Sequence, residues 1–164
     1  MSEPGSQTPY PSQAPPGAGE PSPAVPAYTG KASGPRSGFW RRFAALFIDG
    51  LILTVPNVIF LVLLEYAVAN VLSLIVAIAY YTYFEGSASG QTLGKAALGI
   101  RVIDLKVGGS IGHPRALLRY IARLLSALVF FLGYFWMLWD PEKQTWHDKI
   151  AGSVVVPVDA YPVK

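Results

Sequence analysis

The sequence contains no cysteine. Disulfide frameworks, thiolate zinc sites and cysteine nucleophiles are therefore excluded. Only two histidines are present, His113 and His147, and neither has the paired spacing of a metal-binding motif, so we expect no metal site. The sequence also lacks a serine–histidine–aspartate order and a carboxylate pair suited to acid–base chemistry. We therefore predict that the protein is not an enzyme and carries no cofactor.

Charged side chains are scarce. They make up 14% of the 164 residues, whereas 52% of the residues are hydrophobic and the mean hydropathy is +0.38. Soluble domains carry about 25% charged residues, so this composition indicates a membrane protein with at most one domain. The net charge is +3, and the basic residues stand beside apolar segments. Such residues are typical of membrane flanks, and we predict no nucleic-acid partner.

Proline is concentrated in the first 38 residues. This segment holds nine prolines: Pro4, Pro9, Pro11, Pro15, Pro16, Pro21, Pro23, Pro26 and Pro35. Such a composition cannot bury enough apolar area to offset the entropy of ordering, so residues 1–38 are predicted to be a disordered tail with polyproline II character. The tail could be a solvated tether or a partner-binding arm. It is not expected to be a signal peptide, because it contains no apolar run.

Two long apolar segments follow the tail. Phe43–Leu64 has 22 residues, which as a helix would be about 33 Å long and could cross a hydrocarbon core of about 30 Å. Ala67–Phe84 is the second segment. Between Phe43 and Phe84 the only charged residues are Asp49 and Glu65, so two antiparallel transmembrane helices are predicted. One stripe of the second helix is expected to serve packing: Asn70, Ser73, Ala77 and Tyr80.

The basic residues predict the orientation of these helices. Four precede the first span: Lys31, Arg36, Arg41 and Arg42. Six follow the second span: Lys95, Arg101, Lys106, Arg115, Arg119 and Arg123. The short connection between the spans has none. By the positive-inside rule, the tail and the loop after the second span should be cytoplasmic and the protein should lie in the plasma membrane.

A basic amphipathic helix is predicted further along the chain. Arg115, Arg119 and Arg123 recur every fourth residue and so share one helix face. Five apolar residues take the other face: Leu117, Leu118, Ile121, Leu124 and Leu125. We expect this helix to lie at the membrane interface, and the basic loop to bind anionic lipid. It leads into Leu124–Trp139, a third membrane-embedded segment.

A weak internal repeat bears on the path of the third segment. Gln91-Thr92 is followed by Gly99, and Gln144-Thr145 is followed by Gly152, with eight positions between glutamine and glycine in both copies. A strand-like run comes after each glycine, Ile100–Ile103 and Val154–Val156. If these strands pair, both lie on one side of the membrane and the third segment re-enters. A single crossing would place the C-terminus outside.

Asp49 is the leading candidate for a functional residue. An ionisable group inside a membrane helix costs several kcal/mol unless it is paired or hydrated. Arg42 is seven residues earlier on the same face, but its side chain leans away, so we expect Asp49 to meet another cation. Four residues are candidates for that cation: Arg119, Arg123, His147 and Lys149. Two interpretations stay open, a buried structural pair with Arg42 and a cation or proton site.

Three motifs resemble the RDD family of membrane proteins: GFWRRFAALFIDG from Gly38, GQTLGKAALGIRVID from Gly90 and WDPEKQTWHDKIAGSVVV from Trp139. The family is named for one arginine and two aspartates. The resemblance places the arginine at Arg42 and the first aspartate at Asp49. It places the second aspartate at Asp148, with Asp140 as the alternative. Ser153 stands where relatives often have threonine. The tail is similar to those of actinobacterial proline-rich membrane antigens.

The resemblance implies a multi-pass cell-membrane protein, and for some members an association with sodium/proton exchange. We expect an all-α membrane fold with two transmembrane helices, the amphipathic helix, the third segment and a small cytoplasmic two-stranded element. Residues 39–156 would form the membrane domain and residues 157–164 a C-terminal tail. Our leading hypothesis is transport of a cation or small ligand by a homo-oligomer, with Arg42, Asp49 and Asp148 as the polar site. The alternative is a non-transporting accessory or scaffold subunit bound to a partner membrane protein.

Overall fold

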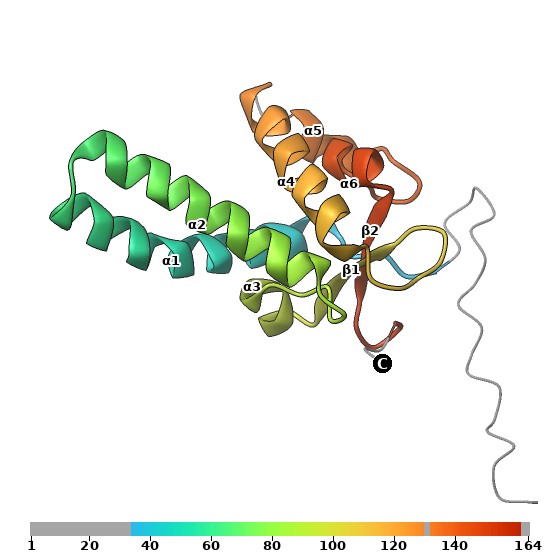
Figure 1. Ribbon diagram of the computed structural model, residues 1–164. Helices are drawn as coiled ribbons and strands as arrows, with labels where there is room; N and C mark the ends of the chain where they lie inside the picture. The colour runs from blue at the N-terminus through green and yellow to red at the C-terminus, as the bar shows by residue number, and fades with distance from the viewer. Residues whose placement is uncertain (1–33, 130–131, 162–164) are drawn as a thin grey trace, which may run out of the picture.

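A computed structural model describes residues 34–129 and 132–161 of the chain. Its longest feature is an antiparallel hairpin of two helices, α1 (Phe39–Leu63) and α2 (Tyr66–Gly86), which extends away from the other elements (Figure 1). Both helices are long and apolar enough to cross a bilayer. The two predicted spans are therefore confirmed, with ends that differ by at most four residues.

The surface of the hairpin is apolar because lipid, rather than protein, surrounds it. Of the 18 residues in the most apolar stretch of each helix, only 6% in α1 and 11% in α2 are buried inside the protein. Glu65 starts α2 by accepting hydrogen bonds from the N–H groups of Ala67 and Val68. Pro56 lies inside α1, where it cannot donate a backbone hydrogen bond.

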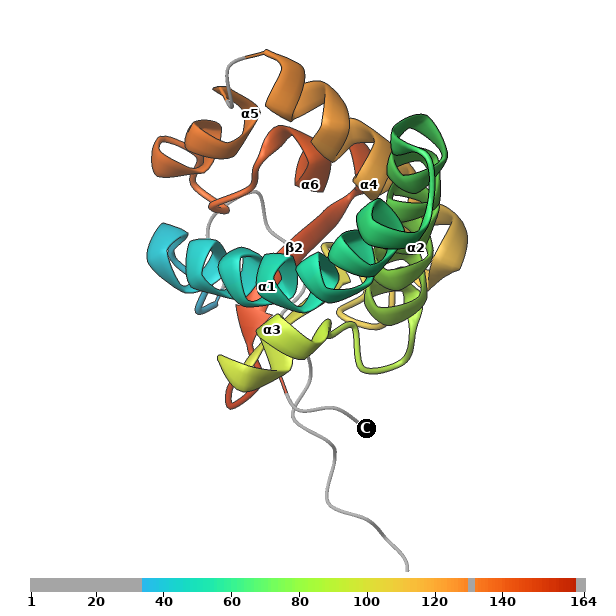
Figure 2. The ribbon, with the colours of Figure 1, turned by 90° about the vertical axis from the view of Figure 1, so that its left-hand side faces the viewer.

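A two-stranded antiparallel sheet lies at the end of the hairpin opposite the α1–α2 connection (Figure 1). It pairs β1 (Ile100–Asp104) with β2 (Ser153–Pro157), so that Ile100 faces Pro157 and Asp104 faces Ser153. This confirms the predicted two-stranded element. Two short helices come before the strands, α3 (Leu93–Ala97) and α6 (Trp146–Ala151), with α3 below the strands and α6 above them in Figure 2.

The sequence repeat is a structural repeat. Thr92 caps α3 by accepting from the Lys95 N–H, and Thr145 caps α6 by accepting from the Asp148 N–H. The glutamine before each threonine donates through Nε2 to the first carbonyl of the following strand. These two bonds are Gln91 to Ile100 at 3.0 Å and Gln144 to Ser153 at 2.7 Å.

The two glycines of the repeat let each helix turn directly into its strand. Gly99 has φ +60° and Gly152 has φ +59°, a left-handed conformation that glycine adopts without steric cost. Their carbonyls accept reciprocal hydrogen bonds, Gly99 from the Val158 N–H and Gly152 from the Leu105 N–H. The two copies therefore close one small sheet with approximate two-fold symmetry.

The third predicted segment consists of separate helical pieces. α4 (Gly112–Leu128) is followed, after residues 130–131 that the structure does not describe, by α5 (Leu132–Phe135) and a 3-10 turn, η1 (Trp136–Leu138). The path bends by 112° between α4 and the later pieces. A broken span and a re-entrant segment both have this geometry.

The predicted amphipathic helix is present as α4. Its basic face points into the protein, whereas in an interfacial helix the basic face would point toward water. Arg119 and Arg123 are only 1% and 8% exposed, whereas Leu118, Leu125 and Leu128 are exposed. The arginines point into the protein because buried carboxylates lie there. The three leucines lie on the outward-facing side of α4.

The folded part extends beyond the predicted boundaries of the membrane domain. Arg36 forms an ion pair with Glu142 at 2.6 Å, and the Ser37 N–H donates to the Val155 carbonyl. Tyr161 packs with Ile103, Val154 and Val156 in an apolar cluster. The predicted disordered tail lies outside the described residues, apart from residues 34–38.

Candidate functional site

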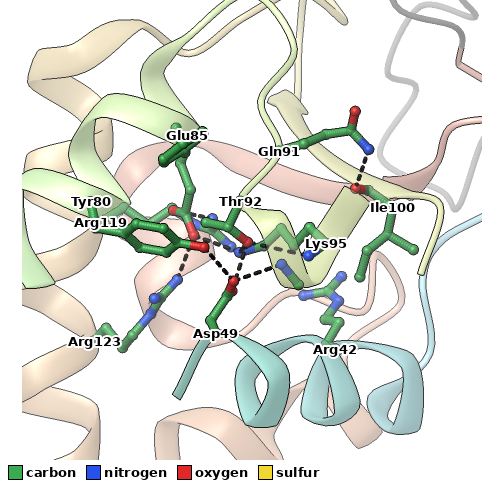
Figure 3. A network of polar contacts seen from close by, with 12 residues as sticks. Arg42, Asp49, Tyr80, Glu85, Gln91, Thr92, Lys95, Ile100, Arg119 and Arg123 are labelled. Atoms are coloured by element: carbon green, nitrogen blue, oxygen red, sulfur yellow. Dashed lines mark hydrogen bonds and ion pairs between the residues drawn. The ribbon is translucent and has the colours of Figure 1, made fainter. Parts of the chain in front are cut away.

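A network of buried ionised side chains lies where α1, α2, α4 and α6 meet (Figure 3). Arg119 of α4 is at its centre. Its Nη1 donates to Glu85 Oε2 at 2.6 Å, and its Nε donates to Asp148 Oδ1 at 3.0 Å. One guanidinium thus joins a carboxylate at the end of α2 to a carboxylate of α6.

Glu85 is fully buried and binds three cations. Besides Arg119, its Oε1 accepts from Lys95 Nζ at 2.7 Å and from Arg123 Nη2 at 2.8 Å. The guanidinium of Arg123 also lies over the ring of Tyr81, 4.4 Å from its centroid, which is a cation–π contact. Burial lowers the pKa of Lys95, and the charge of Glu85 acts in the opposite direction.

Asp148 is the second carboxylate of the network. Its Oδ2 accepts from Arg42 Nη1 at 2.6 Å and also from the N–H of Thr145, which completes the N-terminal capping box of α6. Burial would raise the pKa of Asp148, but the charges of Arg119 and Arg42 outweigh it and hold that pKa below its ordinary value. Asp148 therefore stays ionised at neutral pH.

Asp49 is fully buried and accepts from three neutral donors. The Tyr80 hydroxyl and the Gly94 N–H donate to Oδ1, both at 2.7 Å, and the Thr92 hydroxyl donates to Oδ2 at 2.6 Å. Within residues 34–129 and 132–161, no cation lies within ion-pair distance of Asp49. A predicted contact with one of four cations, Arg119, Arg123, His147 or Lys149, was therefore wrong, and so was a direct pair with Arg42.

Neutral donors replace a cation at Asp49 because the backbone of α3 comes very close to α1. A Cβ atom built on Gly94 would lie 2.2 Å from the Ala45 carbonyl oxygen and 2.8 Å from Asp49 Oδ1. Only glycine leaves room for this approach. The Gly94 N–H and the capping threonine of α3 are thereby brought to the carboxylate.

One chain of contacts connects the three residues that were predicted to form the polar site, Arg42, Asp49 and Asp148. Lys95 Nζ is 3.5 Å from the Thr92 hydroxyl, which donates to Asp49. From Lys95 the chain continues through Glu85, Arg119 and Asp148 to Arg42. Asp49 and Arg42 are therefore at opposite ends of one polar network and do not touch.

The remaining candidate residues lie next to the network or away from it. Arg42 pairs with Asp148 and not with Asp140. Asp140 forms an ion pair with Lys149 instead. The His147 Nε2 is 4.0 Å from Asp148 Oδ1, and the ring meets Tyr134 at 5.1 Å between centroids. Burial lowers the pKa of His147 well below 6.5 and the nearby Asp148 opposes this only in part, so the ring is neutral at pH 7.

Sequence reasoning missed Glu85, Lys95 and Thr92 as members of the site. Glu85 directly follows the predicted second span, which ends at Phe84. A signal was available, because Arg119 and Arg123 share one face of an otherwise apolar helix and such a face needs a carboxylate. The sequence does not say which carboxylate that is.

A partly open cavity of about 320 Å³ lies beside the network. Four cationic side chains line it, Arg42, Lys95, Arg119 and Arg123, together with apolar and neutral groups. Two lining side chains keep a buried nitrogen that has no hydrogen-bond partner among the described residues, Arg123 at Nη1 and His147 at Nδ1. The described part of the chain contains no group of three acidic or histidine side chains that could hold a metal ion.

The model of the RDD family matches residues 36–152. The uncharacterized protein YxaI of Bacillus subtilis is 30% identical over 147 residues, covering 73% of this chain and 96% of that protein. The uncharacterized membrane protein YteJ of the same organism is 28% identical over 142 residues, covering 76% of this chain and 83% of that protein.

The chain is also similar to the proline-rich antigen homolog of Mycobacterium tuberculosis. The two are 35% identical over 78 residues, which cover 48% of this chain and 32% of that protein. No solved structure matches the chain. The family model spans well over half of the sequence and contains the whole network from Arg42 to Asp148. The chain therefore belongs to the RDD family of membrane proteins.

Proposed function

We propose that the protein is a membrane-embedded carrier that holds a small ligand in the cavity beside the buried charge network. The observation that carries this proposal is the cavity itself, about 320 Å³ of space against Arg42, Arg119 and Arg123 in a chain whose spans otherwise face lipid. Small-ligand sites are typically apolar spaces of about 300–1,000 Å³ with a few polar groups.

A small ligand fits this site better than a metal or sodium ion does. The cavity is lined by four cationic side chains, whose direct ion-pair partners are the two carboxylates of Glu85 and Asp148. A cation entering the cavity would meet this excess of positive charge. Asp49, the remaining carboxylate nearby, already accepts from three donors.

The proposed topology places the tail, the sheet and residues up to Tyr161 on the cytoplasmic side, with α4 to η1 re-entering the membrane. The antiparallel pairing of β1 with β2 supports this arrangement, since both strands must then lie on one side. The basic residues on both sides of the hairpin and their absence from the α1–α2 connection support the cytoplasmic assignment. Translocation of the ligand would require self-association, because so few segments cannot enclose a path.

Native mass spectrometry of the protein purified in mild detergent tests the proposal. We expect each protomer to retain a small molecule from its host membrane. Leu46→Trp, which fills the cavity, should abolish the adduct, because Leu46 lines that space. Leu51→Trp is the matched control, since Leu51 is on the same helix and is exposed to lipid.

Two results would count against the carrier. One is an adduct that Leu46→Trp leaves unchanged. The other is a particle without a small molecule but with a second membrane protein at fixed stoichiometry, which would make the chain an accessory or scaffold subunit.

A further inference from the structure

The cavity has a surplus of positive charge on its walls. Arg42, Lys95, Arg119 and Arg123 line it, and the ion pairs that they make end on only two carboxylates, Glu85 and Asp148. Each cation contacts a carboxylate, but four cations share two anions, so positive charge is in excess among these pairs, and Asp49, the next carboxylate of the network, accepts from neutral donors only. An uncompensated charge is expensive where water is excluded, and an anion in the cavity would remove that cost.

Two unused nitrogens belong to side chains that line this space. Arg123 is 8% exposed and uses Nη2 for Glu85, while its Nη1 has no partner among the described residues. His147 is 4% exposed, and its Nδ1 is likewise unpaired in the described part of the chain. Buried polar groups without partners are rare in folded proteins, so each requires an explanation. A ligand oxygen in the cavity would supply one once a small rotation of these side chains brings the buried nitrogens to its surface.

Most of the remaining wall is apolar. Phe39, Phe43 and Leu46 of α1 face the cavity from one direction, and Phe135 and Met137 line it from the C-terminal pieces of the third segment. A small hydrophilic anion would leave this surface without a partner. An apolar chain attached to the anion would cover it, at about 25 cal/mol for each Å² removed from water.

We infer that the cavity binds an anionic amphiphile, with a carboxylate or phosphate oxygen at Arg123 and His147 and one acyl chain along the phenylalanines of α1. This inference rests on the proposed function and gives the substrate class of its site. The volume of about 320 Å³ accommodates an oxyanion head with part of one chain, and because the cavity is partly open the rest of a longer chain can extend into the bilayer.

Four probes added to the full chain in neutral detergent show whether binding requires the negative charge, the apolar chain or both. They are dodecanoate, dodecanol, acetate and phosphatidylglycerol, and native mass spectrometry counts the bound molecules at each concentration. We expect one saturable dodecanoate per protomer. Dodecanol lacks the charge and acetate lacks the chain, so each should bind at least about tenfold more weakly.

Matched variants test the assignment of the head group. Arg123→Lys keeps the positive charge next to Glu85 but removes the free guanidinium nitrogen, and it should weaken dodecanoate binding about tenfold. Arg115→Lys is the control on the same helix, since Arg115 binds Asp104 and does not line the cavity. His147→Leu provides a second test that breaks no hydrogen bond of the described residues, and it should also weaken binding.

The outcomes separate this inference from the carrier proposal. If dodecanoate or phosphatidylglycerol saturates one site that depends on Arg123, the inference holds, and the better probe shows whether the head is a carboxylate or a phosphate. Equal binding of dodecanol, or no effect of either variant, overturns it. A neutral or cationic adduct that Leu46→Trp abolishes would overturn the anionic class and leave the carrier proposal standing.

Discussion

Lys95 and Asp148 occupy the same position in the two copies of the structural repeat, each as the third residue of a threonine-capped helix, and they carry opposite charges. Lys95 binds Glu85, Asp148 binds Arg119, and Arg119 binds Glu85. The repeat thus delivers one cation and one anion to the same network. This relationship explains how a sheet of two short strands can fix the geometry of charges inside the membrane domain.

Removing Arg119 should be among the most damaging single changes in the chain. Arg119→Met would leave Glu85 and Asp148 buried without the guanidinium that joins them. Loss of one partner from a buried ion pair costs about 3–5 kcal/mol. Unfolding of the purified protein by heat and denaturant measures the effect.

The control for this change is Arg115→Met on the same helix. The side chain of Arg115 is 39% exposed where it pairs with Asp104, so we expect a clearly smaller loss. Equal losses for the two variants would mean that the buried network contributes no more to stability than a partly exposed ion pair does.

Gly94→Ala should separate α3 from α1. The new Cβ would lie 2.2 Å from the Ala45 carbonyl oxygen, so the backbone must shift and the Gly94 N–H must leave Asp49. We expect a loss of about 1–3 kcal/mol, as for other overpacked sites. Gly50→Ala is the matched control in α1, where a Cβ meets nothing within 4 Å, and it should be neutral or slightly stabilising.

Asp49→Asn tests whether Asp49 is a structural acceptor. The three donors stabilise the carboxylate, so the variant should fold with a stability about 1–3 kcal/mol lower. Thr92→Val removes one of these donors. If the two residues act through their shared hydrogen bond, the double variant should lose less than the sum of the single losses. Full additivity, together with loss of cation flux in proteoliposomes for Asp49→Asn, would instead favour a cation site.

The elements of the fold were largely predictable from the sequence, whereas the partners in the site were not. Long apolar runs specify α1 and α2 through their composition alone, and the Gln-Thr repeat indicated the pairing of β1 with β2 because each copy carries its own cap and turn glycine. Asp49 was recognisable by its charge within a membrane helix. The hydrogen-bond donors of Asp49 were not recognisable. The Gly94 N–H, for example, reaches the carboxylate only because α3 packs closely on α1.

The sequence also did not predict which face of α4 is buried. The spacing of Arg119 and Arg123 identifies a common face but does not say whether that face meets water or buried carboxylates. The decision depends on Glu85 and Asp148, which lie 34 and 29 residues from Arg119 along the chain. Binding of anionic lipid by the basic loop stays a prediction, with Arg119 and Arg123 now engaged inside the protein.

Acidification should destabilise the protein through His147. Burial lowers the pKa of this ring well below 6.5, so the unfolded chain takes up a proton at a higher pH than the folded protein does. The stability that the neutral His147 ring contributes is fully present above about pH 6.5. Below that pH the free energy of unfolding falls by at most about 1.4 kcal/mol per pH unit. Thermal unfolding between pH 7.5 and 5.5 should show this slope in the wild type and much less of it in His147→Gln. His113→Gln, at an exposed position, should retain the slope.

The proposed topology can be tested by labelling single cysteines, because the natural chain has none. Val107→Cys follows β1, Asp159→Cys follows β2, and Tyr66→Cys lies at the α1–α2 connection, all at exposed positions. In intact cells a membrane-impermeant maleimide should label only the Tyr66 variant. Labelling of the Asp159 variant without the Val107 variant would show that the third segment crosses the membrane.

The distance in sequence between Arg42 and Asp148, 106 residues, sets an order of events during synthesis. The ribosome makes the α1–α2 hairpin, and then Arg119, well before it makes Asp148. During that interval Arg42 has no access to its carboxylate, and Arg119 can bind only Glu85. Asp148 is therefore the last charged residue of the network to be made, and a polypeptide truncated before α6 would leave Arg42 and Arg119 without their common counterion.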